Sequence, residues 1–71
     1  MKAYTLRLLV KSRGKVLYEN KNMMDSDDYD EVAAERQRLI KEEWKKISKK
    51  IQEDTGVEAD KQIGMFFIDR G

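Results

Sequence analysis

The chain has 71 residues, of which 39% are hydrophobic and 41% are charged, and its formal net charge is +1. A chain this short buries roughly 60% of its unfolded surface in one core, so we expect one domain spanning residues 1–71. The absence of Cys and His excludes disulfides, thiolate zinc sites and catalysis by cysteine or imidazole. No apolar run approaches the roughly 20 residues of a membrane span, and no signal peptide precedes the first strand pattern. We therefore expect a cytoplasmic protein without cofactors or membrane contact.

Two strands joined by a hairpin are predicted first. Apolar and polar side chains alternate over residues 3–11 and again over residues 15–20, which is typical of strands with one buried face. A two-residue turn would put Val16 and Tyr18 on the opposite face from the leucines of the first strand. The sequence therefore favours a three-residue loop with Gly14 in the left-handed conformation.

That register makes two further predictions about the outer face of the hairpin. Leu9 lies opposite Leu17, so that two leucines face outward together. Arg7 lies opposite Glu19, where the two side chains form a cross-strand ion pair.

A long helix is predicted from about Ser26 to Thr55. Its apolar residues recur every three, four or seven positions, in a stripe that Val32 and Leu39 widen on one side: Tyr29, Ala33, Ile40, Trp44, Ile47 and Ile51. Aspartates near the start are candidate caps, and Gly56 is suited to end the helix in the left-handed conformation. Such a helix is about 42 Å long, whereas seven-residue strands span only about 23 Å. The helix is expected to overhang the sheet, kink or pack on a partner.

A third strand is predicted over residues 62–70, and either of its faces can be the buried one. In ββαβ order, the helix returns the chain so that the third strand pairs antiparallel beside the first. The predicted fold is α+β, with a three-stranded antiparallel sheet in the order 2-1-3 and one long helix packed on one face.

The open face of this sheet is the main candidate for function. One helix covers only one side, which leaves apolar side chains from all three strands facing water. We predict that this face binds a protein partner or a second copy of the chain through Leu9, Leu17, Phe66 and Ile68. Met65 and Phe67 replace the last two if the third strand presents its other face.

The alternative is a nucleic-acid site on a basic face of the helix. Its residues recur at spacings of three and four: Arg38, Lys41, Lys45 and Lys49. Such a stripe can neutralise phosphates, with basic residues of the hairpin tip adding to it. Glutamates interrupt the stripe and no aromatic residue interleaves to stack a base, so a solvated helix face is the commoner explanation.

Catalysis is not expected, because no carboxylate pair lies in an apolar context and the glycines are scattered singly. The acidic run of residues 25–31 lacks the glycine and the glutamate spacing of a calcium loop, and capping of the helix explains it better. In size and composition the chain is similar to the small accessory proteins that bacteriophages and prophages encode, a likeness that supplies no site residues. The sequence thus predicts a small protein-binding or dimerising module that modulates a larger protein.

Overall fold

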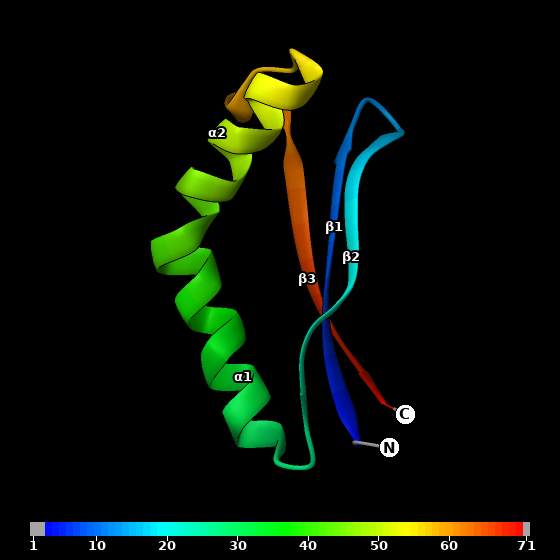
Figure 1. Cartoon of the computed structure of the whole chain (residues 1–71), viewed down its shortest axis with the longest axis vertical. Helices are drawn as coiled ribbons and strands as arrows, with labels where there is room; N and C mark the ends of the chain where they lie inside the picture. The colour runs from blue at the N-terminus through cyan, green and yellow to red at the C-terminus, as the bar shows by residue number, and fades with distance from the viewer. Residues whose placement is uncertain (1–2, 71) are drawn as a thin grey trace.

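The structure is a computed structural model that describes residues 3–70. Its elements, in chain order, are β1 (Tyr4–Ser12), β2 (Lys15–Ser26), α1 (Tyr29–Arg38), the π-helical turn η1 (Leu39–Glu43), α2 (Trp44–Thr55), the 3-10 turn η2 (Ala59–Lys61) and β3 (Ile63–Arg70). The strands form one antiparallel sheet in the order β2-β1-β3, and α1, η1 and α2 run as one helix along one face of it (Figure 1). The predicted α+β fold and strand order are confirmed.

The turn between β1 and β2 differs from the predicted one. Ser12 pairs with Lys15, so only Arg13 and Gly14 form the turn, and their φ angles are 52° and 79°. Two successive positive φ angles define a type I′ turn, whose twist matches that of the flanking strands. The predicted three-residue loop is therefore wrong.

A β-bulge explains how a two-residue turn still places Tyr18 on the buried face of the sheet. Lys11 pairs with Val16 whereas Val10 pairs with Tyr18, which leaves Leu17 as an extra residue on β2. The extra residue returns Tyr18 to the face of Val10, and Val16 stays 57% exposed on the other face. The hairpin thus has a short turn and still has Tyr18 on the buried face, the arrangement for which a longer loop was predicted.

β2 continues through residues 21–24, beyond the strand predicted over residues 15–20, and ends at Ser26. Its 12 residues extend about 40 Å at 3.3 Å per residue. The helix from Tyr29 to Thr55 is also about 40 Å long at 1.5 Å per residue. β2 therefore matches the helix in length, whereas β1 and β3 are shorter, with 9 and 8 residues.

The helix ends follow the local sequence. Ser26 still pairs with Tyr4 in the sheet, so the helix begins at Tyr29, three residues later than the earliest predicted start. Asp28 caps it, because its carboxylate accepts a hydrogen bond of 3.0 Å from the backbone N–H of Asp30. Gly56 ends it with a φ of 78°, as predicted.

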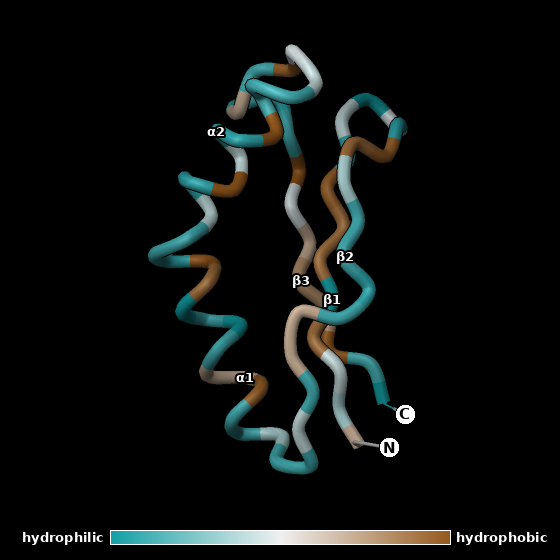
Figure 2. Tube along the Cα trace, in the orientation of Figure 1, coloured by the Kyte–Doolittle hydropathy of each residue, from teal (hydrophilic) through white to brown (hydrophobic). Residues whose placement is uncertain are grey.

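In the first half of the helix, the face that packs on the sheet is rotated from the predicted stripe, whereas Trp44, Ile47 and Ile51 of the second half pack against the core as predicted. Val32, Leu39 and Ile51 are the buried apolar residues of the helix, whereas Ile40 is 47% exposed. They cover the hydrophobic side of β1, where Leu6, Leu8 and Val10 are fully buried. Figure 2 shows hydrophobic residues along both the helix and the sheet. Val32 and Leu39, which only widened the predicted stripe, are therefore the centre of the buried face in the first half of the helix.

The π-helical turn η1 accounts for this rotation. The backbone N–H of Trp44 donates to the carbonyl of Leu39, five residues earlier, instead of four. In a regular α-helix, two residues five positions apart point about 140° away from each other. The wider turn reduces that angle, so both Leu39 and Trp44 contribute to the core side of the helix.

Trp44 packs directly on β3. A Cβ atom on Gly64 would lie 2.4 Å from two carbons of the indole ring, so the ring occupies the space that a side chain would need. The same ring meets Phe66 edge to face, with ring centroids 6.2 Å apart. Gly64 therefore allows the helix to approach β3 closely.

Replacing Gly64 with alanine is expected to destabilise the fold, because the added methyl group overlaps Trp44. We expect Gly64→Ala to lower the free energy of unfolding by about 1–3 kcal/mol, which urea unfolding followed by circular dichroism measures. In a Trp44→Leu background the penalty of Gly64→Ala should be smaller, because the ring is gone. Equal penalties in the two backgrounds would contradict this packing.

Candidate protein interface

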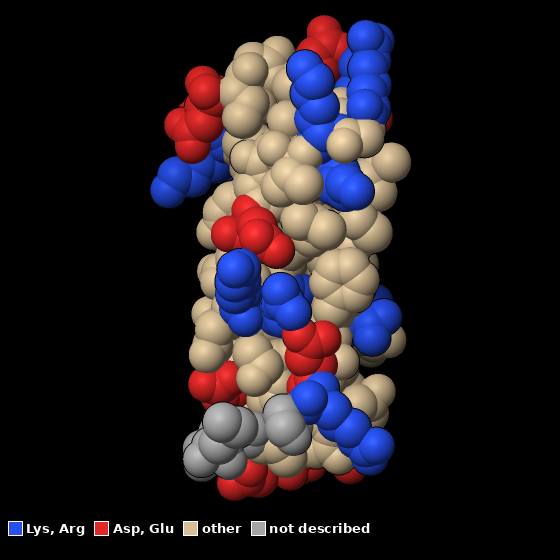
Figure 3. Space-filling model, turned by 90° about the vertical axis from the view of Figure 1, so that its right-hand side faces the viewer, with Lys and Arg blue, Asp and Glu red and all other residues tan. Residues whose placement is uncertain are grey.

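The outer face of the sheet, turned away from the helix, carries apolar side chains from all three strands. Alternation along β1 and β3 puts Leu9, Ile63, Met65 and Phe67 on this face, and Val16 joins them from β2. Ile63 is 62% exposed and Phe67 42%. Figure 3 shows this face, where basic and acidic groups both interrupt and border the uncharged surface. Lys11, for example, lies between Val16 and Ile63. We call the five apolar residues the outer-face patch.

Three of the four residues predicted for this face lie on the core side. Phe66 pairs with Leu8 and is 9% exposed, and Ile68 packs against the core as well. Leu17 also packs against the core, because it is the extra residue of the bulge. Only Leu9 lies on the outer face as predicted. β3 instead has Met65 and Phe67 on the outer face, which is the alternative that the sequence left open.

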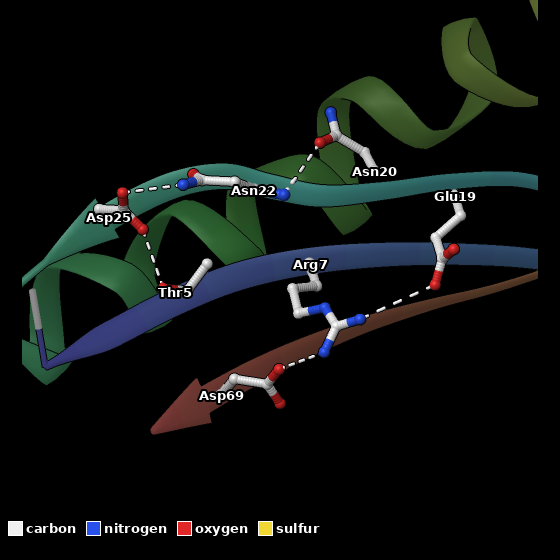
Figure 4. A network of polar contacts seen from close by, with 7 residues as sticks. All are labelled: Thr5, Arg7, Glu19, Asn20, Asn22, Asp25 and Asp69. Atoms are coloured by element: carbon white, nitrogen blue, oxygen red, sulfur yellow. Dashed lines mark hydrogen bonds and ion pairs between the residues drawn. The ribbon is translucent and has the colours of Figure 1, made fainter. Parts of the chain in front are cut away.

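Arg7 crosses the outer face and joins its three strands (Figure 4). Its guanidinium forms an ion pair with Asp69 of β3 and a second one with Glu19 of β2, with an N–O distance of 3.8 Å to Glu19. The hydrogen bond to Asp69 is the main cause that raises the pKa of Arg7, and both negative charges add to it. The predicted pair of Arg7 and Glu19 is confirmed, although Glu19 lies opposite Leu9.

Polar side chains hold the irregular part of β2 farther along the same strand pair. Asp25 accepts hydrogen bonds of 2.8 Å from the hydroxyl of Thr5 and from the amide of Asn22, and the side chain of Asn20 accepts one from the backbone N–H of Asn22 (Figure 4). This end of the outer face is therefore polar, and the apolar surface lies toward β3 and the hairpin.

A groove runs between the helix and the free edge of β3. Residues 64–67 line it on the strand side, and Arg36, Ile40 and Trp44 line it on the helix side, around a volume of about 480 Å³. A second hollow continues along the flank of α1, lined by Ala33, Ala34, Arg36, Gln37, Ile40 and Lys41. Because Met65 and Phe67 belong both to the groove and to the outer-face patch, the apolar surface turns around the β3 edge without a break.

The two edges of the sheet differ in character. β2 carries charged residues along its length and departs twice from regular pairing with β1. β3 pairs with β1 in one unbroken register, and residues 63–68 contain neither a charge nor a proline. Charges and bulges are the devices that protect an edge strand from pairing with another chain. The β2 edge has this protection and the β3 edge lacks it.

The basic helix face is exposed, but it is partly neutralised. Arg38 forms ion pairs with Glu35, Glu42 and Glu43, and its hydrogen bond to Glu35 lowers the pKa of that carboxyl. The three other basic residues of the predicted stripe are exposed on the helix: Lys41, Lys45 and Lys49. Helix-surface pairing explains Arg38 without any ligand.

No helix among residues 3–70 is both long enough and apolar enough to cross a bilayer. No family model matches the chain, and neither a curated protein nor a solved structure matches it.

Proposed function

We propose that this chain is a non-enzymatic protein-interaction module of the cytoplasm, which docks on a larger protein or on itself through the outer-face patch and the β3 edge. One observation carries the proposal: apolar side chains from three adjacent strands are exposed together and continue around an unprotected edge. Contiguous exposed apolar patches of this kind mark protein–protein sites.

The composition of the patch supports a protein partner more than a nucleic acid. Aromatic residues and methionine are enriched at protein interfaces, and the patch contains Phe67 and Met65. Arg7 is tied to two carboxylates at its border, so it is less suited to neutralise a phosphate. The border thus supplies polar groups around an apolar centre, as in the rim of a protein interface.

Affinity capture from cell lysate tests this function with a matched pair of variants. Phe67→Glu places a charge in the patch at a half-exposed position, and we expect it to reduce capture of protein partners by about tenfold or more while circular dichroism stays unchanged. Lys45→Glu with Lys49→Glu is the control on the basic helix face and should leave capture unchanged.

Nuclease treatment of the lysate separates the two candidate functions. Protein capture that resists nuclease and depends on Phe67 supports the interaction module. Capture that disappears with nuclease or with the Lys45 and Lys49 reversals, and that Phe67→Glu leaves intact, would contradict it and assign the function to the basic face.

A further inference from the structure

We propose that a second copy of this chain covers the β3 edge, with the two β3 strands paired antiparallel about a twofold axis. The two sheets then form one six-stranded sheet, and the two helices lie side by side on the same face of it. The inference rests on the proposed interaction function and names one partner for it. The part of the outer-face patch away from the seam stays available in each copy.

The form of the β3 edge is the first observation that supports this dimer. Backbone N–H and C=O groups on the outer side of an edge strand lack a strand partner, and a straight, uncharged strand is the form most ready to accept one. β3 has this form over residues 63–68, with Asp69 and Arg70 only at its end. A twofold axis makes one surface complementary to itself, so a single unprotected edge suffices for closure.

The flank of the helix distinguishes a second copy from an isolated strand. Ala33, Gln37 and Ile40 follow one another at spacings of four and three along the flank beside the β3 edge. An added peptide strand would cover the edge but would leave this flank exposed. A second copy brings its own helix on the same side of the sheet, and the small side chain of Ala33 allows a close approach.

The charge order along the helix favours the antiparallel arrangement. Acidic residues lie in the first turn, with Asp30 and Glu31 after the cap Asp28, and the second half of the helix carries Lys45, Lys46, Lys49 and Lys50. Figure 1 shows the helix aligned with the strands, so antiparallel β3 strands bring antiparallel helices. The acidic first turn of each helix then lies near the lysines of the other helix, which stabilises the pair. These lysines precede the last turn, which carries Glu53 and Asp54 and no basic residue.

The available area matches what a dimer requires. The Cα atoms extend over 37 × 22 × 16 Å, and helix and sheet lie next to each other in the view along the shortest axis (Figure 1). The outline of a side of 37 by 22 Å is about 800 Å², and this upper limit of the contact area reaches what each partner buries in a standard interface. The β3 edge alone would supply only part of this area, so the helix flank is needed as well.

Sedimentation equilibrium and amide hydrogen exchange of the full chain test the inference. We expect a concentration-dependent species of twice the 8.4 kDa chain mass, with slowed exchange of those β3 amides that do not bond to β1. Ile40→Glu should weaken dimerisation by about tenfold or more, because Ile40 is an exposed residue of both hollows. Lys21→Glu, at an exposed position of the β2 edge outside the outer-face patch, is the control and should leave dimerisation unchanged. Higher salt should also weaken the dimer.

Two results would overturn the inference. The first is a chain that stays monomeric up to millimolar concentration. The second is a dimer that tolerates Ile40→Glu and leaves alternate β3 amides exchanging fast, because such a dimer uses another surface. Neither result affects the proposed interaction function, which fails only if capture does not depend on Phe67.

Discussion

Val32→Glu is expected to unfold the protein, whereas Ile40→Glu leaves it folded. Val32 is fully buried against the sheet, so a carboxylate there has neither water nor a cation to compensate its charge. An uncompensated buried charge costs about 3–5 kcal/mol, which is most of the roughly 4–10 kcal/mol that a domain of this size has available. Far-UV circular dichroism and urea unfolding measure the difference.

Ile40→Glu is the matched control, since it makes the same kind of change in the same helix at a residue that is 47% exposed. At a protein concentration low enough to keep the chain monomeric, we expect it to cost less than about 1 kcal/mol. If Ile40→Glu unfolded the protein and Val32→Glu did not, the helix would face the sheet with the stripe centred on Ile40, and the rotated packing would be wrong.

Gln62→Glu is expected to give the second-largest effect and a dependence on pH. The buried side-chain amide of Gln62 donates hydrogen bonds of 3.0 Å to the carbonyls of Ser48 and Val57, and so ties β3 to the end of α2. A carboxylate in its place accepts but does not donate, and it would face two carbonyl oxygens. We expect a loss of about 2–4 kcal/mol at pH 7.

The sign of the pH dependence follows from burial. Burial and the two carbonyls raise the pKa of the introduced carboxyl in the folded state above its unfolded value of about 4.3. The loss of free energy of unfolding caused by Gln62→Glu is therefore largest above the folded-state pKa and becomes smaller as the pH falls toward the unfolded-state pKa. The reason is that the protonated acid donates one hydrogen bond again. Urea unfolding between pH 7 and pH 4 measures it.

Gln62→Met provides the comparison, because it removes the same two hydrogen bonds without introducing a titratable group. The difference in free energy of unfolding between Gln62→Met and the unmodified chain should therefore be the same at every pH. A deficit of Gln62→Glu that stays constant from pH 7 to pH 4 would mean that the introduced carboxyl reaches water, in conflict with the buried position of Gln62.

The sequence predicted that the candidate site is an open apolar face of the sheet, but most of the residues predicted for it were wrong. An apolar face of the sheet left open by the helix followed from composition and strand order, and Leu9 lies there. Leu17, Phe66 and Ile68 lie on the core side instead, because a β-bulge and the face chosen by β3 are decided by packing. The groove beside β3 had no signal in the sequence, since it needs the helix and strand to be placed relative to each other.

Features that depend on neighbouring residues were predictable from the amino-acid sequence. Alternation along β1 and β3 indicated strands, Gly56 marked the end of the helix, and the ββαβ order indicated the strand order, whereas the choice of Asp28 among several candidate caps came from the structure. Each of the predicted features follows from the conformational preferences of a few adjacent residues, which are present in any chain with that local sequence.

Features in which a shift of one residue changes the exposed face depend on packing between distant segments of the chain. The bulge at Leu17 and the π-helical turn before Trp44 each insert one residue, and each turns side chains from one side of its element to another. Their energies depend on what packs across the core: Trp44 on Gly64 orients β3, and β1 receives Val32 instead of Ile40. The periodicity of apolar residues is the same on both sides of such an insertion, so it does not show which face of the element is exposed. Packing across the complete core decides that.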